Sequence, residues 1–271
     1  MPADGSRGDD VTITRASYRR GVRRAEKTLA KRVSGYLQDP SEKNVHDLRT
    51  ATRRLLAAVP LLPKKLRNRR KLSKYTSRLQ KLMKLNAKTR DLDIVTYKVS
   101  QRSRTDKHAT LLRKLGGLRD SSIEPGLDFA RSLRNDLGFP VKLEDLSGPG
   151  IRRRFDKVSV RYALEIEKRL PTVLNKPEEK KELHLLREDV RRLRYTLDLG
   201  EGGVHSGPLK RLRSWQDALG EIHDSDIFIQ YFDSPEKTGE VSSLLDDEVV
   251  ARNRLYEKFR VLAKTRLKLA G

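Results

Sequence analysis

The sequence contains no cysteine, which excludes disulfide bonds, thiol chemistry and cysteine-ligated metal sites. Aromatic residues make up only 6% of the 271 residues, and hydrophobic residues 36%. No apolar run is long enough to span a membrane, and the N-terminal residues 1–6 lack the apolar core of a signal peptide. From these absences we expect a soluble, cytoplasmic protein without a membrane partner.

Carboxylates are also absent over one long stretch. Between Leu48 and Arg90 the chain has 43 residues, fifteen of them lysine or arginine, and neither aspartate nor glutamate. The whole chain carries 60 basic and 37 acidic residues, a formal net charge of +23. An exposed helix normally mixes both signs of charge, because pairs one turn apart then support it. We therefore expect a polyanionic partner that compensates this charge.

The apolar residues recur with a helical period, and no alternating strand pattern of useful length occurs, so the sequence predicts an all-α fold. Residues 1–13 are polar and indicate a disordered leader. The predicted helices of the first half cover residues 14–38, 41–62, 64–88, 91–103, 106–121 and 125–137, with Pro125 at a junction. Residues 138–150 are rich in glycine and proline and predict a linker. The second half predicts helices over residues 151–171, 177–199, 208–222, 224–233 and 235–269, with a glycine-rich loop at 200–203.

A basic motif, His-x2-Arg-x3-Arg-Arg, occurs once in each half. Its first copy is His46, Arg49, Arg53 and Arg54, and its second is His184, Arg187, Arg191 and Arg192. An Asp-x-Asp element follows each copy, at Asp91/Asp93 and Asp224/Asp226. The offset between copies is 138 residues for the histidines (184 − 46) and 133 for the first aspartates (224 − 91). These values fit a duplicated unit whose halves differ by five residues in one connection. We therefore divide the chain into repeat one (14–137), the linker (138–150) and repeat two (151–271).

The position of the basic motif on its helix predicts a groove. At about 100° per residue, the histidine and arginines of each copy lie beside the apolar stripe of their helix and not opposite it. Arginine suits such a wall, because its planar guanidinium can hold two phosphate oxygens and stays charged. The candidate anion-binding residues are His46, Arg49, Arg53, Arg54, Arg78, Arg90, His184, Arg187, Arg191, Arg194 and Arg211. For the two histidines, donation to phosphate and a hydrogen bond to a neighbouring helix are both open.

The chain resembles the CHAD family, named for a conserved histidine in an α-helical domain. The matching stretches are Val45–Arg54, Arg90–Asp93, Leu183–Arg187, Arg191–Tyr195 and Gln216–Asp224. The resemblance covers nearly all of residues 14–271 and implies two helical-bundle repeats related by pseudo-twofold symmetry, with a basic groove between them. It also implies binding of inorganic polyphosphate and targeting to polyphosphate granules.

The Asp-x-Asp elements allow three interpretations. Each pair lies where a new helix is predicted to begin, and aspartate is a favoured N-cap, so we expect capping. The carboxylates could instead bind a divalent cation that bridges to phosphate, or form salt bridges that orient the arginines.

Catalysis finds little support in the sequence. Gly200–Gly203 lacks the Lys-Ser/Thr of a phosphate-binding loop, and no histidine spacing suits zinc. We therefore expect a non-catalytic polyphosphate-binding protein that needs no cofactor or metal. The alternatives are a nonspecific nucleic-acid-binding protein and a metal-dependent polyphosphate hydrolase.

Overall fold

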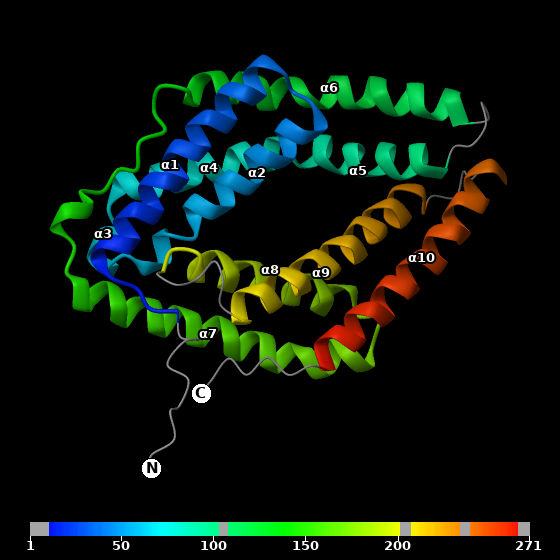
Figure 1. The fold of residues 1–271 in the computed structure, drawn as a ribbon. Coiled ribbons are helices and arrows are strands. Elements are labelled where there is room, and N and C mark those ends of the chain that lie inside the picture. Colours follow the sequence, from blue (N-terminus) through cyan, green and yellow to red (C-terminus); the bar gives the residue numbers. More distant parts are fainter. Residues whose placement is uncertain (1–10, 103–107, 201–206, 234–238, 265–271) are drawn as a thin grey trace, which may run out of the picture.

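The computed structural model describes residues 11–102, 108–200, 207–233 and 239–264, and its regular structure is helical apart from one isolated β-bridge residue, Thr12. The first half contains α1 (Arg15–Gln38), α2 (Glu42–Leu56), the 3-10 turn η1 (Val59–Leu61), α3 (Lys64–Arg67), α4 (Arg70–Leu85), α5 (Ala87–Arg102) and α6 (Ala109–Leu133). The 3-10 turn η3 (Leu143–Asp145) precedes α7 (Gly148–Asn175), α8 (Lys180–Leu197), α9 (Gly207–Phe232) and α10 (Gly239–Lys264). The predicted all-α fold is confirmed (Figure 1). None of the described helices combines the length and apolarity needed to cross a membrane.

The helices pack as pairs that follow the same order in both halves. In the first half α1 packs on α2 and α5 on α6, and in the second half α7 packs on α8 and α9 on α10. The halves meet where α5 lies along α9, and where α7 passes beside α1 and η1 (Figure 1). This arrangement places α2, α5, α8 and α9 around the middle of the molecule.

One pair of arginines makes the same two contacts in the two halves. Arg119 on α6 donates to Asp93 Oδ1 on α5 at 2.6 Å and to the Pro40 carbonyl at 2.7 Å. Arg252 on α10 donates to Asp226 Oδ1 on α9 at 2.8 Å and to the Pro177 carbonyl at 3.1 Å. Each arginine thus connects the last helix of its half to the loop that follows the first helix of that half. Matched contacts of this kind are what a duplicated unit would give.

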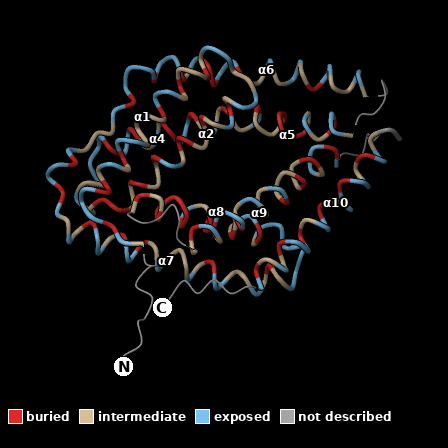
Figure 2. Tube along the Cα trace, in the orientation of Figure 1, coloured by how far each residue is buried: buried red, intermediate tan, exposed pale blue. Residues whose placement is uncertain are grey.

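Burial of the apolar stripes holds the helices together. A capping box begins α1, in which Thr14 and Ser17 each accept from the other's backbone N–H. The main core then draws buried residues from α1, α2, α4, α6, α7, α8, α9 and α10, with Trp215 of α9 packed edge-on against Phe259 of α10. A second, smaller core joins α5 and α6 to α9 and α10 around Phe228. Figure 2 shows the buried residues concentrated where the helices face one another.

The N-terminal segment before α1 binds to the second half. Ile13 is buried in the main core and Val11 packs against it. A side chain at Gly200 would collide with the Thr12 carbonyl, 2.6 Å from the position of its Cβ, so only glycine permits this approach. The leader predicted over residues 1–13 is therefore ordered at its end, because two apolar residues there have a core to enter; residues 1–10 lie outside the described residues.

Several predicted helix boundaries are wrong. Pro125 lies inside α6, which runs through the predicted break, and α9 runs through the predicted break at residue 223. The helix predicted over 64–88 is instead α3 and α4, and that over 41–62 is α2 followed by η1. The predicted linker ends early, because α7 begins at Gly148 with the Ser147 side chain accepting from Gly150 N–H. Residues 201–203 of the glycine-rich loop lie outside the described ranges.

A single residue, Asn86, separates α4 from α5. Its side chain accepts from the Tyr36 hydroxyl at 2.6 Å and donates to the Leu82 carbonyl at 2.9 Å, in full burial. Gly126 of α6 lies against this pair, where a Cβ would be 2.7 Å from the Tyr36 hydroxyl. The close approach of α6 fixes the turn and so the direction in which α5 leaves toward α9.

Candidate functional site

A cavity of about 450 Å³ lies where α2, α5, α8 and α9 meet, and we call it the central cavity. Two of its helices come from each half of the chain. Its lining residues are His46, Arg49, Thr50, Arg53 and Arg54 of α2; Arg90, Asp91 and Ile94 of α5; Arg187, Arg191, Arg194 and Tyr195 of α8; and Gln216, Asp217, Gly220, Glu221, His223, Asp224 and Ile227 of α9. The structure thus brings eight of the eleven sequence-predicted anion-binding residues together.

The other three predicted residues do not line the central cavity. Arg78 on α4 forms an ion pair with Asp136 and borders a separate surface pocket with Lys71 and Lys74. His184 lies next to the cavity, with its ring centroid 5.5 Å from that of His223, which does line it. Arg211, on the first turns of α9, is outside the lining. Whether these three residues take part in binding stays a prediction.

Arg53 and Arg187 line the same cavity, and neither forms a direct ion pair with a described carboxylate, although Asp224 and Glu188 counter part of the lowering of the Arg187 pKa. Burial, followed by the charges of Arg191, Arg49 and Arg187, lowers the pKa of Arg53 to about 9. Burial and the charge of Arg191 likewise lower the pKa of Arg187 to about 10. The Arg53 Nε is buried and has no hydrogen-bond partner among the described residues. An arginine keeps its proton at neutral pH, so these side chains hold concentrated positive charge that an anion would stabilise.

Tyr195 joins the arginines of the two halves at one side of the cavity. The guanidinium of Arg194 lies 4.6 Å from the centre of its ring, and that of Arg54 lies 5.8 Å away, within the range of cation–π attraction. Arg194 is buried and donates from Nε to Gln216 at 2.7 Å. Arg49 is similarly held, because it donates to the Met83 carbonyl of α4. These three arginines are therefore oriented before any ligand arrives.

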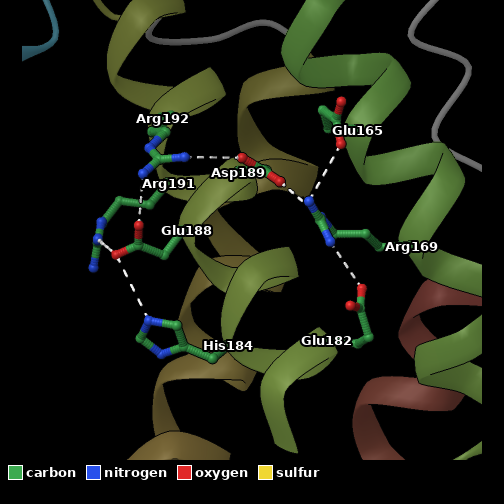
Figure 3. A network of polar contacts seen from close by, with 8 residues as sticks. All are labelled: Glu165, Arg169, Glu182, His184, Glu188, Asp189, Arg191 and Arg192. Atoms are coloured by element: carbon green, nitrogen blue, oxygen red, sulfur yellow. Dashed lines mark hydrogen bonds and ion pairs between the residues drawn. The ribbon is translucent and has the colours of Figure 1, made fainter. Parts of the chain in front are cut away.

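The second half also carries carboxylates that partly neutralise its basic helix. Glu188 lies 2.6 Å from Arg191 and 2.7 Å from Arg192, and its carboxylate is 4.0 Å from His184. Asp189 bridges Arg192 to Arg169 of α7 (Figure 3). Arg192 is therefore turned toward these acids and does not line the cavity, unlike its counterpart Arg54. The cationic surface of the cavity is consequently stronger on the side of α2.

Two of the acidic lining residues, Asp91 and Asp224, belong to the Asp-x-Asp elements, for which capping was expected and a place beside the phosphate was an alternative. Asp91 lies inside α5 and Asp224 inside α9, so the prediction that the Asp-x-Asp elements cap helices is wrong. Burial raises the pKa of both carboxyls, against the lowering effect of Arg49 on Asp91 and of Arg90 on Asp224. The second aspartates, Asp93 and Asp226, pair instead with Arg119 and Arg252. The shared 133-residue offset of Asp91/Asp224 and of Ile94/Ile227 was the signal that could have placed them in one site.

Two histidines of the cavity are held neutral. Burial, with the charges of Arg187, His184 and Arg191, lowers the pKa of His223 to about 3. Burial and Arg90 also lower the pKa of His46. Each ring can donate one hydrogen bond while neutral, and two once a bound anion allows it to take up a proton. His223 stands where the first half has Arg90, so the cavity has a permanent cation on one side and a titratable one on the other.

The arrangement is chemically suited to binding an anion. Seven arginines and two histidines converge on a space that also holds four carboxylates. Within the described ranges no cluster of three or more histidines, cysteines or carboxylates is arranged to hold a metal ion. Phosphate oxygens can accept from several guanidinium groups at once, and such charge-assisted bonds are shorter and stronger than neutral ones.

Comparisons with known proteins agree on one family. Residues 20–233 match the family model of the CHAD domain. The fold is similar to the CHAD domain from the plant Ricinus communis, with a TM-score of 0.57 and 15% identity over 99% of this chain and 93% of that one. It is also similar to PptA from Streptomyces chartreusis, with a TM-score of 0.64 and 13% identity over 93% of this chain and 98% of that one. No curated protein matches the chain. At these identities the structural likeness is one of fold.

Proposed function

Because the chain belongs to the CHAD domain family, we propose that it binds inorganic polyphosphate in the central cavity. The observation that carries this proposal is the meeting of Arg53 and Arg187 in one cavity. These two half-buried arginines come from different halves and form no ion pair in the described chain, and the charge of Arg187 lowers the pKa of Arg53. A polyphosphate chain supplies about one negative charge per phosphate, so a row of phosphates could neutralise both walls together.

A second cavity supports a ligand longer than one phosphate. This cavity, of about 440 Å³, shares Arg90, Ile94, Glu221 and Asp224 with the central cavity. Lys98 lines its far side and donates to Glu248 and Ser225. A flexible polymer could pass from the arginines of the central cavity along this side, which a small anion would leave empty.

We propose that binding needs no metal and that the protein is not a hydrolase. Asp93 and Asp226 are occupied by arginines, which leaves Asp91 and Asp224 as the only members of the Asp-x-Asp elements that line the cavity. Loss of binding in EDTA, restored by magnesium, would contradict the first point. Release of orthophosphate from long-chain polyphosphate in the presence of magnesium would contradict the second.

Nucleic acid is the alternative polyanion. Of the described phenylalanine, tyrosine and tryptophan residues, Tyr195 alone lines the central cavity. Its ring contacts two arginines, so it offers no free platform for the base stacking of single-strand binding. The major groove of duplex DNA alone is about 12 Å wide and can hold a whole α-helix. A duplex is therefore too wide to enter a cavity of about 450 Å³. DNA would then contact only the outer surface.

The deciding experiment is competition between long-chain polyphosphate and duplex DNA, matched by phosphate concentration at physiological salt. We expect polyphosphate to displace DNA, and Arg53→Gln and Arg187→Gln to weaken polyphosphate binding much more than DNA binding. Arg153→Gln is the matched control, because Arg153 is exposed on α7 and lies outside both cavities. Equal competition, with both ligands equally sensitive to the cavity variants, would favour the nucleic-acid function.

Family resemblance also suggests where the protein acts. We propose that it is cytoplasmic and associates with polyphosphate granules through the same cavity. A fluorescently tagged protein should then concentrate on granules in cells, and the Arg53→Gln/Arg187→Gln double variant should stay diffuse at the same expression level.

A further inference from the structure

Among the described residues, no other helix covers the outer face of α10, and this face has a regular pattern. The inner face packs on α9 and on the end of α7, with Tyr256 and Phe259 buried and the Tyr256 hydroxyl bonded to the Val173 carbonyl. On the opposite face Val250 and Val261 are exposed by 50% and 69%, unusually high for valine. These two valines line an open hollow along α10 together with Asn253, Arg254, Glu257 and Lys258. In Figure 1 α10 forms the lower right edge of the molecule.

The exposed residues of this face follow the spacing of a coiled coil. Asp247, Val250, Arg254, Glu257, Val261 and Lys264 are all exposed and are separated alternately by three and four residues. We call these six residues the outer seam of α10. A period of 3.5 residues keeps one stripe of a helix facing a second helix along its whole length. On the inner face of α10, Tyr256, Phe259 and Ala263 recur at helical spacing and are buried against the rest of the protein.

We propose that the outer seam binds the outer seam of a second copy of this chain, with the two α10 helices antiparallel and related by a twofold axis near Leu255 and Tyr256. A twofold interface is self-complementary, so each contact occurs twice. In this register Val250 meets the partner subunit's Val261. Arg254 meets the partner subunit's Glu257, and Asp247 meets the partner subunit's Lys264. Every apolar residue of the outer seam then faces an apolar one, and every charge faces its opposite.

The charge of α10 favours this partner in particular. The whole chain has a formal net charge of +23, which opposes contact between most surfaces of two copies. The sequence of α10 contains five acidic and five basic residues, so its own net charge is zero. Two copies can therefore approach through α10 with less repulsion than through the basic helices α3 and α4.

The size of the seam implies a reversible dimer. From Asp247 to Lys264 the helix rises about 25 Å at 1.5 Å per residue, and the seam has only two valines per copy. Such a contact is smaller and more polar than the interfaces of permanent dimers. We therefore expect monomer and dimer to exchange with concentration.

Sedimentation velocity over a concentration series, without any polyanion, tests the proposal. The wild-type chain should shift from monomer to dimer. Arg254→Glu and Glu257→Arg should each prevent the shift, because each places like charges opposite one another twice. The double variant Arg254→Glu/Glu257→Arg should dimerise again, since the opposed charges are then exchanged and still complementary. Val261→Asp should be monomeric, and Arg153→Glu, a charge reversal elsewhere on the surface, should behave as wild type.

Two outcomes would overturn the proposal. One is a wild-type chain that remains monomeric throughout the series. The other is a dimer that persists in the single charge variants or is not recovered in the double variant, because the contact then lies elsewhere. Circular dichroism and thermal unfolding of each variant separate loss of the dimer from loss of fold. The measurement does not depend on polyphosphate binding, so either proposal can fail while the other stands.

Discussion

Arg53 and Arg187 are half-buried arginines of the central cavity that form no direct ion pair among the described residues. Burial lowers the pKa of both, and the charge of Arg187 lowers that of Arg53 further. Burial of an unpaired cation costs free energy, because the solvation it loses is not replaced. The ligand-free protein therefore keeps a locally unfavourable arrangement that a bound anion converts into a favourable one.

Substitution of Arg53 should separate binding from stability. We expect Arg53→Gln to weaken polyphosphate binding by roughly tenfold or more, the effect of losing one charge-assisted hydrogen bond of about 1.5–3 kcal/mol. In the absence of ligand the same variant should unfold at an equal or higher temperature, because a source of repulsion is removed. Calorimetric titration and thermal unfolding measure the two effects. A variant that binds normally but melts earlier would show that Arg53 is structural.

The neutral histidines predict a pH dependence of binding. The pKa of His223 is about 3 in the free protein, and a polyanion in the cavity must raise it. At any pH between the pKa of the free protein and that of the complex, binding is therefore accompanied by uptake of a proton on His223. Affinity should therefore increase as the pH falls from about 7.5 toward 5, by at most about tenfold per pH unit for each linked proton. Protonation of Asp91 and Asp224, whose pKa values are raised, acts in the same direction.

The same histidine affects stability with a defined sign. The unfolded chain takes up a proton on His223 near its ordinary pKa of about 6.5, whereas the folded chain does not until about 3. The free energy of unfolding should therefore fall as the pH falls through this window. His223→Gln should flatten both this dependence and that of the dissociation constant. Wild-type and variant curves that remain parallel would remove His223 from the explanation.

In each half, one arginine on the last helix holds that helix to the helix before it. Arg119 connects α6 to Asp93, and Arg252 connects α10 to Asp226. The Asp93 carboxylate is almost fully buried, whereas that of Asp226 is partly exposed. Removal of one partner leaves the other charge without compensation, which costs most where water is excluded.

We expect Asp93→Ala to lower the free energy of unfolding by about 3 kcal/mol and Asp226→Ala by less, on the scale of broken buried ion pairs. Asp128→Ala is the control, because Asp128 forms an exposed pair with Arg131 within α6 and should contribute less than about 1 kcal/mol. Urea unfolding gives the three values. Equal effects of Asp93→Ala and Asp128→Ala would mean that the connection between α5 and α6 is not held by this pair.

The helices that carry the site could be predicted from sequence, but their ends often could not. In α2 and α8 the apolar stripe and the basic residues beside it are local features of one helix, and eight of the predicted residues do line the cavity. The break between α4 and α5 at Asn86 depends on the hydrogen bond from Tyr36, which is distant in the sequence. The helix α6 continues through Pro125, and its Gly126 packs against Asn86 and Tyr36, which are distant in the sequence as well. Asp91 and Asp224 resemble N-caps locally, yet their helices begin earlier. Arg78 turns to Asp136, a partner that no local spacing indicates.

At the scale of the whole molecule, the cavity exists only because two halves meet. Each half contributes one helix of the basic motif and one helix with an aspartate and an isoleucine. Neither half alone could surround a chain of phosphates, since α5 and α9 form the contact that positions both walls. The number of phosphates held should then reflect both halves together.

Salt dependence measures that number. The logarithm of the association constant should fall linearly with the logarithm of salt concentration, with a slope set by the phosphates neutralised. Removing Arg53 should reduce the slope by roughly one, and removing Arg53 and Arg187 together by roughly two. Fluorescence anisotropy of a labelled polyphosphate across a salt series gives the slopes. A slope unchanged in the double variant would place the ligand on another surface.

The contact of Val11 and Thr12 with Gly200 bears on the order of folding during synthesis. The helices α1 to α6 leave the ribosome first and can collapse on one another, as domains made early generally do. Gly200, which lies against Val11 and Thr12, follows α8 and is translated much later. Until then this contact cannot form, so the residues before α1 can complete their packing only after α8 has been made.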